Sequence, residues 1–270
     1  MTEQAGPLII IGGHEDKDGD RVILRAVAEQ LGGRKLVLAT IASSRPEGYL
    51  DTYRAAFDGL GIGELVELYL DSRADAHDED TLALLDGAGG VFFSGGDQLR
   101  ITSSIGDTPV EARIRELWSR GGVVAGTSAG ASAMSDTMLV RGAGTESHRI
   151  GDLRMAPGLA FLTGITVDQH FAERGRIGRL LGAVAQNPRV LGVGIDEDTA
   201  ILVRGDGFEV LGSGAVYVVD GSTVTRSNVA EARPDTTLSM HDVRLHVLSA
   251  GDSFRMSERR PERLAGAAAR

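Results

Sequence analysis

The chain has 270 residues, of which 42% are hydrophobic, and it has no cysteine, so it can bury a substantial core but can form no disulfide and has no thiol nucleophile. Asp and Glu number 38 against 28 Lys and Arg, a formal net charge of −10 at pH 7 that argues against nucleic-acid binding. No apolar run is long enough to span a membrane, and no basic segment precedes the first one. We therefore expect no membrane span, no secretory signal and a cytoplasmic location.

Apolar runs alternate with amphipathic stretches in the first half of the chain. Strands are predicted at 7–13, 35–43, 65–70, 89–96 and 123–130. Helices are predicted between them, over DGDRVILRAVAEQLGG, GYLDTYRAAFDGLG, DEDTLALLDGA and TPVEARIRELWSRGG. Continuous apolar strands separated by single helices are typical of a parallel sheet that is buried on both faces. Right-handed crossovers place helices on both faces, so we predict a doubly wound, mostly parallel α/β fold.

The pattern changes after about residue 137. The segment 191–226 has strand-like runs separated by Gly-Asp-Gly, Gly-Ser-Gly and Asp-Gly, which are typical hairpin turns. We expect antiparallel C-terminal strands that extend the same sheet. No linker-like segment interrupts the chain, so one α/β domain is predicted over 1–256. A charged and then low-complexity tail, frayed or helical, is predicted over 257–270.

A Gly-x-Ser-x-Gly pattern, Gly126 to Gly130, ends the fifth predicted strand. In a nucleophile elbow the serine lies on a strained turn between strand and helix, which needs very small neighbours such as Ala129 and Ala131. The amides at the start of the helix favour negative charge and could stabilise an oxyanion. The alternative is a small-residue junction with a buried serine. The preceding strand and the following helix favour Ser128 as a nucleophile.

A serine nucleophile needs a base, and His170 is the candidate by elimination. It follows the apolar GITV, where a strand should end, and precedes a strong helix pattern. The remaining histidines lie in predicted turns, loops or polar strands, and they are His14, His77, His148, His241 and His246. Of these, only His14 follows a predicted parallel strand, where it could line a cleft or sit in a solvated turn.

Three carboxylates after the strand LGVGI could orient His170. Asp196 and Asp198 would share one face and Glu197 the other, and spacing does not say which face points inward. All these groups follow strands of the predicted sheet, whose carboxyl ends meet at one edge. Their order, serine, histidine, acid, differs from the serine, acid, histidine order of α/β-hydrolases and argues against that family.

Four segments, FFSGGDQLRI, GTSAGASAM, DQHFAERGRIGRLLGAV and GVGIDEDTAI, resemble the cyanophycinase branch of the peptidase E-like serine peptidases. The likeness extends from IIIGGHEDK to HVLSAGDSF, and the arginine-rich DQHF block is its most specific element. The resemblance implies a fold like that of class I glutamine amidotransferases, with serine in place of their cysteine, and a homodimer. The implied substrate is cyanophycin, a poly-aspartate whose side chains carry arginine, and the implied product is β-aspartyl-arginine.

The resemblance also implies roles for individual residues. Ser128 would be the nucleophile, His170 the base and Glu197 the acid. We expect the amides of Gly96 and Ala129 to form the oxyanion hole. The residues expected to line the substrate site are Gln98, Asp168, Gln169, Arg176 and Arg179, with Arg174 as a weaker member.

The arginines have a physical reason to bind such a substrate. Arg176 and Arg179 are three residues apart and share a helix face, and a guanidinium suits the free carboxylates of a β-linked aspartyl chain. The alternative is that these arginines form a basic helix face exposed to solvent. Asp97 and Asp168 could meet the substrate's arginines, although Asp97 could equally cap the helix that begins QLRI.

No cofactor or metal is expected. IGGHEDKDGD lacks the Gly-Lys-Ser/Thr of a P-loop, and His14-Glu15 lacks the second histidine of a zinc motif. Two alternative functions are left open: a related dipeptidase for aspartyl or isoaspartyl peptides, and a non-catalytic homologue that binds peptides. The arginines argue against the first, and the presence of serine, histidine and acid together argues against the second.

Overall fold

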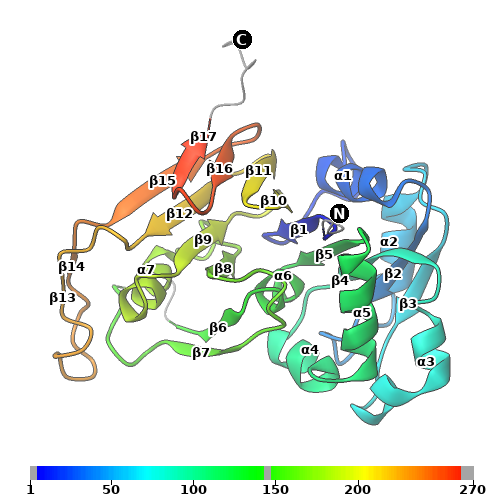
Figure 1. Ribbon diagram of the computed structural model, residues 1–270, viewed down its shortest axis with the longest axis horizontal. Coiled ribbons are helices and arrows are strands. Elements are labelled where there is room, and N and C mark those ends of the chain that lie inside the picture. Colours follow the sequence, from blue (N-terminus) through cyan, green and yellow to red (C-terminus); the bar gives the residue numbers. More distant parts are fainter. Residues whose placement is uncertain (1–4, 143–146, 263–270) are drawn as a thin grey trace.

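Parallel strands form one half of the central sheet (Figure 1). They are β1 (Leu8–Ile11), β2 (Lys35–Ala39), β3 (Leu65–Leu68), β4 (Ala88–Phe93) and β5 (Val123–Thr127). Their order in the sheet is β1-β5-β4-β2-β3. The computed structural model describes residues 5–142 and 147–262. Each strand lies within or overlaps a predicted apolar run, so the prediction of a parallel sheet is confirmed.

Helices cover both faces of this half of the sheet. They are α1 (Val22–Leu31), α2 (Tyr49–Phe57), the 3-10 helix η1 (Ala74–His77), α3 (Glu79–Ala83), α4 (Gln98–Ile105) and α5 (Pro109–Ser119). Along β1, Ile9 and Ile11 belong to a core cluster with α1 and α2, whereas Leu8 and Ile10 belong to a cluster with α4 and α5. All four side chains are buried, which explains the continuous apolar run and confirms the doubly wound α/β class.

Antiparallel strands extend the sheet on the other side of β1. They are β10 (Thr199–Arg204), β11 (Gly207–Gly212), β16 (Ser253–Arg255) and β17 (Arg260–Glu262). The complete order is β17-β16-β11-β10-β1-β5-β4-β2-β3, and β1 pairs antiparallel with β10. The hairpin prediction for this part of the chain is therefore confirmed.

Other C-terminal strands leave the central sheet. A second sheet contains β8 (Ile165–Gln169), β9 (Leu191–Ile195), β12 (Val216–Asp220) and β15 (Arg244–Leu248), in the order β15-β12-β9-β8. The prediction that all these strands extend one sheet is wrong for β9 and β12. Gly192 and Gly194 leave one face of β9 free for the helix α7 (Ile177–Gln186) and the Phe171 ring, while Val193 and Ile195 join the main core.

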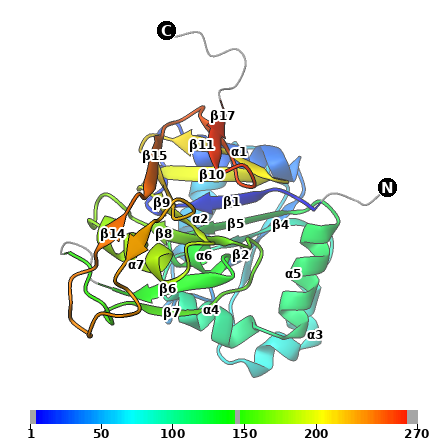
Figure 2. The same ribbon diagram turned by 60° about the vertical axis from the view of Figure 1, so that its left-hand side comes forward.

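A short helix connects the two sheets. This helix, α6 (Ala129–Ala133), contacts β5 of the central sheet and β8 of the second sheet (Figure 2). Two small pairs complete the described structure: β6 (Thr137–Arg141) with β7 (Arg154–Pro157), and β13 (Arg226–Ser227) with β14 (Met240–His241). Within residues 5–142 and 147–262, no helix is long and apolar enough to cross a membrane.

The end of the chain differs from the predicted tail. Strand β17, which lies inside the segment predicted as a tail, pairs with β16 at the edge of the central sheet. The guanidinium of Arg255 donates two hydrogen bonds to the Glu262 carboxylate, at 2.8 and 3.1 Å. An edge strand of charged residues has no apolar pattern to reveal it, which is why the prediction ended the domain too early. The remainder of the predicted tail, 263–270, lies outside the described residues.

The close packing of β9 can be tested by adding one methyl group. A Cβ at Gly194 would lie 2.5 Å from the Phe171 ring. Gly194→Ala should therefore lower the free energy of unfolding by about 1–3 kcal/mol, the usual cost of overpacking. Urea denaturation measures the change, with Gly207→Ala as a control because its added Cβ would meet only a carbonyl oxygen 3.5 Å away. Equal stability of the parent and Gly194→Ala would contradict this account.

Candidate active site

Ser128 occupies a strained turn between β5 and α6. Its backbone angles, φ 53° and ψ −110°, lie outside the regions that non-glycine residues commonly adopt. The turn depends on glycine at two positions. A Cβ at Gly126 would lie 2.6 Å from the carbonyl carbon of Gly130, and a Cβ at Gly130 would lie 2.3 Å from the Phe93 carbonyl oxygen. The small residues of this segment thus allow the sharp turn that presents Ser128, as the sequence predicts.

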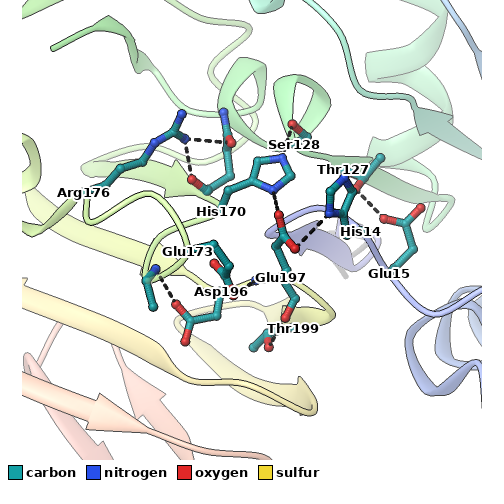
Figure 3. A network of polar contacts seen from close by, with 12 residues as sticks. His14, Glu15, Thr127, Ser128, His170, Glu173, Arg176, Asp196, Glu197 and Thr199 are labelled. Carbon is teal, nitrogen blue, oxygen red and sulfur yellow. Dashed lines mark hydrogen bonds and ion pairs between the residues drawn. The ribbon is translucent and has the colours of Figure 1, made fainter. Parts of the chain in front are cut away.

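Ser128, His170 and Glu197 form a continuous hydrogen-bonded chain (Figure 3). The Ser128 hydroxyl lies 2.9 Å from His170 Nε2, and His170 Nδ1 lies 2.6 Å from Glu197 Oε1. His170 is buried and directly follows β8, at the carboxyl end of that strand. Glu197 follows β9, the neighbouring strand. The structure therefore brings together Ser128 and His170, which the sequence patterns favoured, and Glu197, which the family resemblance singled out.

Backbone contacts explain why Glu197, of the three adjacent carboxylates, faces the histidine. The Asp196 carboxylate accepts hydrogen bonds from two loop amides, at 2.9 and 3.1 Å. The Asp198 carboxylate accepts one from an amide at 2.9 Å and one from a hydroxyl at 2.7 Å. Both aspartates thus stabilise the loops around β9, which leaves Glu197 to contact His170.

The surroundings of His170 and Glu197 keep the imidazole neutral and the carboxylate ionised. Burial lowers the pKa of His170 below its ordinary 6.5, although the hydrogen bond to Glu197 raises it in part. Burial raises the pKa of Glu197, but its hydrogen bonds with His170 and His14 lower it more, so the net shift is downward. At neutral pH the imidazole is therefore neutral and the carboxylate is ionised, as a general base and its orienting acid require.

A second histidine contacts the same carboxylate. His14 follows β1, and its Nδ1 lies 2.8 Å from Glu197 Oε2. The centroids of the His14 and His170 rings are 5.1 Å apart. Gly13 allows this approach, because a Cβ there would lie 2.3 Å from the His170 ring. The position of His14 after a predicted strand could be seen in the sequence. Its contacts with residues that follow β8 and β9 could not.

A buried glutamate that contacts the residue before Ser128 was not predicted. Glu15 accepts hydrogen bonds from the hydroxyls of Tyr53 and Thr127, both at 2.6 Å, and from Lys17 Nζ at 2.8 Å. Burial raises the pKa of Glu15, but Lys17 and the two hydroxyls lower it by more. The net shift of the pKa is downward, so the carboxylate is ionised at neutral pH. Because Thr127 directly precedes Ser128, this network connects the ends of β1 and β5.

A pocket of about 440 Å³ opens beside Ser128. The side chains and glycines that line it include His14, Lys17, Glu47, Tyr49, Gly95, Gly96, Ser128, His170 and Arg174. Gly96 and Arg174, which were predicted for the oxyanion hole and the substrate site, both line this pocket. Ala129 is the first residue of α6, so its amide belongs to the helix end whose N–H groups lack intrahelical acceptors.

The remaining predicted substrate residues lie elsewhere. Asp168 is fully buried and accepts hydrogen bonds from Arg179 Nε at 2.6 Å and from Arg176 Nη1 at 3.3 Å. Arg176 also donates to Gln169 Oε1 at 2.8 Å. Arg176 and Arg179 are only 9% and 6% exposed. Gln98 donates to a backbone carbonyl at 2.8 Å.

Arg176, Arg179 and Asp168, which were predicted to line the substrate site, pair with one another in this structure and do not line the pocket beside Ser128. A charge this far from water needs a partner, and Asp168 supplies it for both arginines. Burial lowers the pKa of Arg176 to about 10, which still leaves the group charged at neutral pH. Asp97 accepts a hydrogen bond from the Leu99 amide at the start of α4, so its capping alternative is correct.

Comparisons with known proteins agree with the fold. The model of peptidase family S51 matches residues 8–211, which include Ser128, His170 and Glu197. The cyanophycinase of Synechococcus elongatus is 38% identical over 255 residues, which cover 93% of this chain and 79% of the relative. The cyanophycinase of Trichormus variabilis is also 38% identical, over 257 residues that cover 93% of this chain and 86% of the relative.

A solved structure shares the fold. The peptidase from an acI-B1 actinobacterium superposes with a TM-score of 0.70 and 22% identity, covering 94% of this chain and 98% of the other. The matched family model and the relatives together decide the classification. The chain belongs to peptidase family S51.

Proposed function

We propose that this protein is a serine-type exopeptidase that hydrolyses cyanophycin to β-aspartyl-arginine dipeptides. The observation that carries the proposal is the chain of Ser128, His170 and Glu197, with contacts of 2.9 and 2.6 Å beside a pocket. The substrate class follows from the relatives, which are named cyanophycinases and are 38% identical to this chain.

The proposed reaction proceeds through an acyl-enzyme. Neutral His170 accepts the Ser128 proton as Oγ attacks the carbonyl of the aspartyl backbone, and Glu197 stabilises the imidazolium that forms. The amides of Gly96 and Ala129 donate hydrogen bonds to the oxyanion. His170 then gives the proton to the departing amine. Water, activated by the same ring, hydrolyses the ester and frees Ser128.

Charged side chains of the pocket suit the zwitterionic polymer. Arg174 and Lys17 both line the pocket, and their side chains can bind the carboxylate of a β-linked aspartyl residue. Arg174 is exposed, in contrast to the buried Arg176. Glu47, also exposed at the pocket, can meet a substrate guanidinium. We therefore assign carboxylate binding to Arg174 and Lys17.

Incubation with insoluble cyanophycin tests the activity and the nucleophile together. The parent should release soluble β-aspartyl-arginine, identified by mass spectrometry. Ser128→Ala should release it more slowly by up to about 10⁶-fold, as loss of a serine nucleophile does elsewhere. Failure to attack the polymer, with cleavage of simple aspartyl or isoaspartyl dipeptides instead, would favour the dipeptidase alternative. Undiminished activity of Ser128→Ala would exclude the mechanism.

The pH profile of kcat/KM tests the pair of His170 and Glu197. Neutral His170 is the active form, so activity should fall as the pH drops through its pKa, at a midpoint below 6.5. Glu197→Gln removes a contact that raises this pKa. The variant should therefore lose about 10²- to 10⁴-fold in kcat/KM, and its acid midpoint should move to lower pH. Glu209→Gln, on β11, is the control. A midpoint that moves to higher pH would contradict the assignment.

Two arginine variants distinguish substrate binding from support of the fold. Arg174→Ala should raise KM by about 10- to 100-fold, the value of a charged hydrogen bond, and leave thermal unfolding unchanged. Arg179→Ala leaves the buried Asp168 carboxylate undercompensated and should lower the free energy of unfolding by about 3–5 kcal/mol. Steady-state kinetics and denaturation of both variants measure the contrast. A raised KM with unchanged stability for Arg179→Ala would indicate that Arg179 binds the substrate.

A further inference from the structure

Two imidazoles and one carboxylate converge at the edge of the pocket. His14 Nδ1 and His170 Nδ1 lie 2.8 and 2.6 Å from the two oxygens of Glu197, and Figure 3 shows both rings directed at this carboxylate. One donor atom from each residue lies within 4.8 Å of the others. Among residues 5–142 and 147–262, no other three histidine or acidic side chains form such a group.

From this geometry we propose that His14, His170 and Glu197 form a Zn²⁺ site whose occupation inhibits the peptidase. Two imidazole nitrogens and a carboxylate oxygen are a donor set that zinc takes with one coordination position left open. The His14 side chain is 72% exposed, so the ion can enter from the pocket, and this ring is free to adjust. Zinc needs its donors at about 2.0–2.2 Å, so the three groups would separate slightly around the ion.

Zinc competes with the hydrogen bonds that make His170 a base. In the free protein the Nδ1–H of His170 faces Glu197, and Nε2 is left to accept the Ser128 proton. When the Zn–Nδ1 bond forms, the single proton of the neutral ring must be on Nε2. That nitrogen then donates toward Ser128 Oγ and can accept no proton. Inhibition follows from the change of tautomer alone, and this step rests on the proposed function.

The site could not be found from local sequence motifs. Its ligands follow β1, β8 and β9, so they are far apart in the chain and have none of the short spacings that zinc motifs show. The His14-Glu15 pair looks like a fragment of such a motif, but Glu15 faces Tyr53 and Thr127 instead. The metal would bind through side chains that already serve the peptidase.

Calorimetric titration of ZnCl₂ into Ser128→Ala protein tests binding without any need for activity. We expect one saturable site per chain, and MgCl₂ should not bind because magnesium prefers oxygen ligands. Adding His14→Asn should weaken zinc binding by at least about tenfold, since even residues behind metal ligands cost about 10- to 100-fold. Asparagine suits the left-handed backbone at this position, φ 47°. The matched control adds His77→Ala, at an exposed position, to the Ser128→Ala protein, and its affinity for zinc should be unchanged.

The second arm measures peptidase activity against zinc concentration. Zinc should inhibit the parent and the His77→Ala single variant equally, and EDTA should restore activity. Whatever activity His14→Asn retains should need at least about tenfold more zinc for half inhibition. Absence of saturable binding up to millimolar zinc, or equal affinity with His14→Asn, would overturn the proposal. Zinc binding by a protein that does not attack cyanophycin would instead refute the proposed function and leave the metal site standing.

Discussion

The hydrogen bond between Ser128 and His170 joins two sheets. Ser128 follows β5 of the central sheet, and His170 follows β8 of the second sheet. Their 2.9 Å contact therefore requires that the sheets keep a fixed separation. Helix α6, which starts immediately after Ser128 and contacts β8, maintains that separation with its small buried residues. A side chain at Gly130 would clash with β4. The small residues that permit the turn therefore also allow α6 to pack closely on the central sheet.

Strain and buried charge accompany this junction. His14, Ser128, His170 and Asp198 all have positive φ and all follow strands near the pocket, at a typical cost of about 1–3 kcal/mol each. Sharp turns of this kind bring side chains back over the sheet edge toward one another. The surrounding fold must offset the cost, and hydrogen bonds such as those of the Asp196 carboxylate to two loop amides contribute to it.

Two buried ionic networks flank Ser128, His170 and Glu197. Glu15 connects the ends of β1 and β5, and Asp168 holds the start of α7 to the end of β8 through Arg176 and Arg179. Each buried carboxylate has cationic or hydroxyl partners, so neither is left uncompensated. Preorganised polar groups of this kind contribute to catalysis because they need no rearrangement during the reaction.

The parallel half of the sheet, the turn at Ser128 and the position of His170 at the end of a strand could all be predicted from the sequence. Apolar runs, glycine spacing and strand ends are local properties, and each can be recognised from neighbouring residues. The division into two sheets could not be predicted from the sequence, because it depends on how closely α7 packs on Gly192 and the Phe171 ring packs on Gly194. Only the tertiary structure showed that Arg176 and Arg179 are buried, because their partner Asp168 lies on a different element. From spacing alone the orienting acid stayed open among three carboxylates, and Glu197 was singled out only by family resemblance. Contacts distant in sequence explain that choice physically, since they occupy Asp196 and Asp198 and bring His14 to the remaining carboxylate.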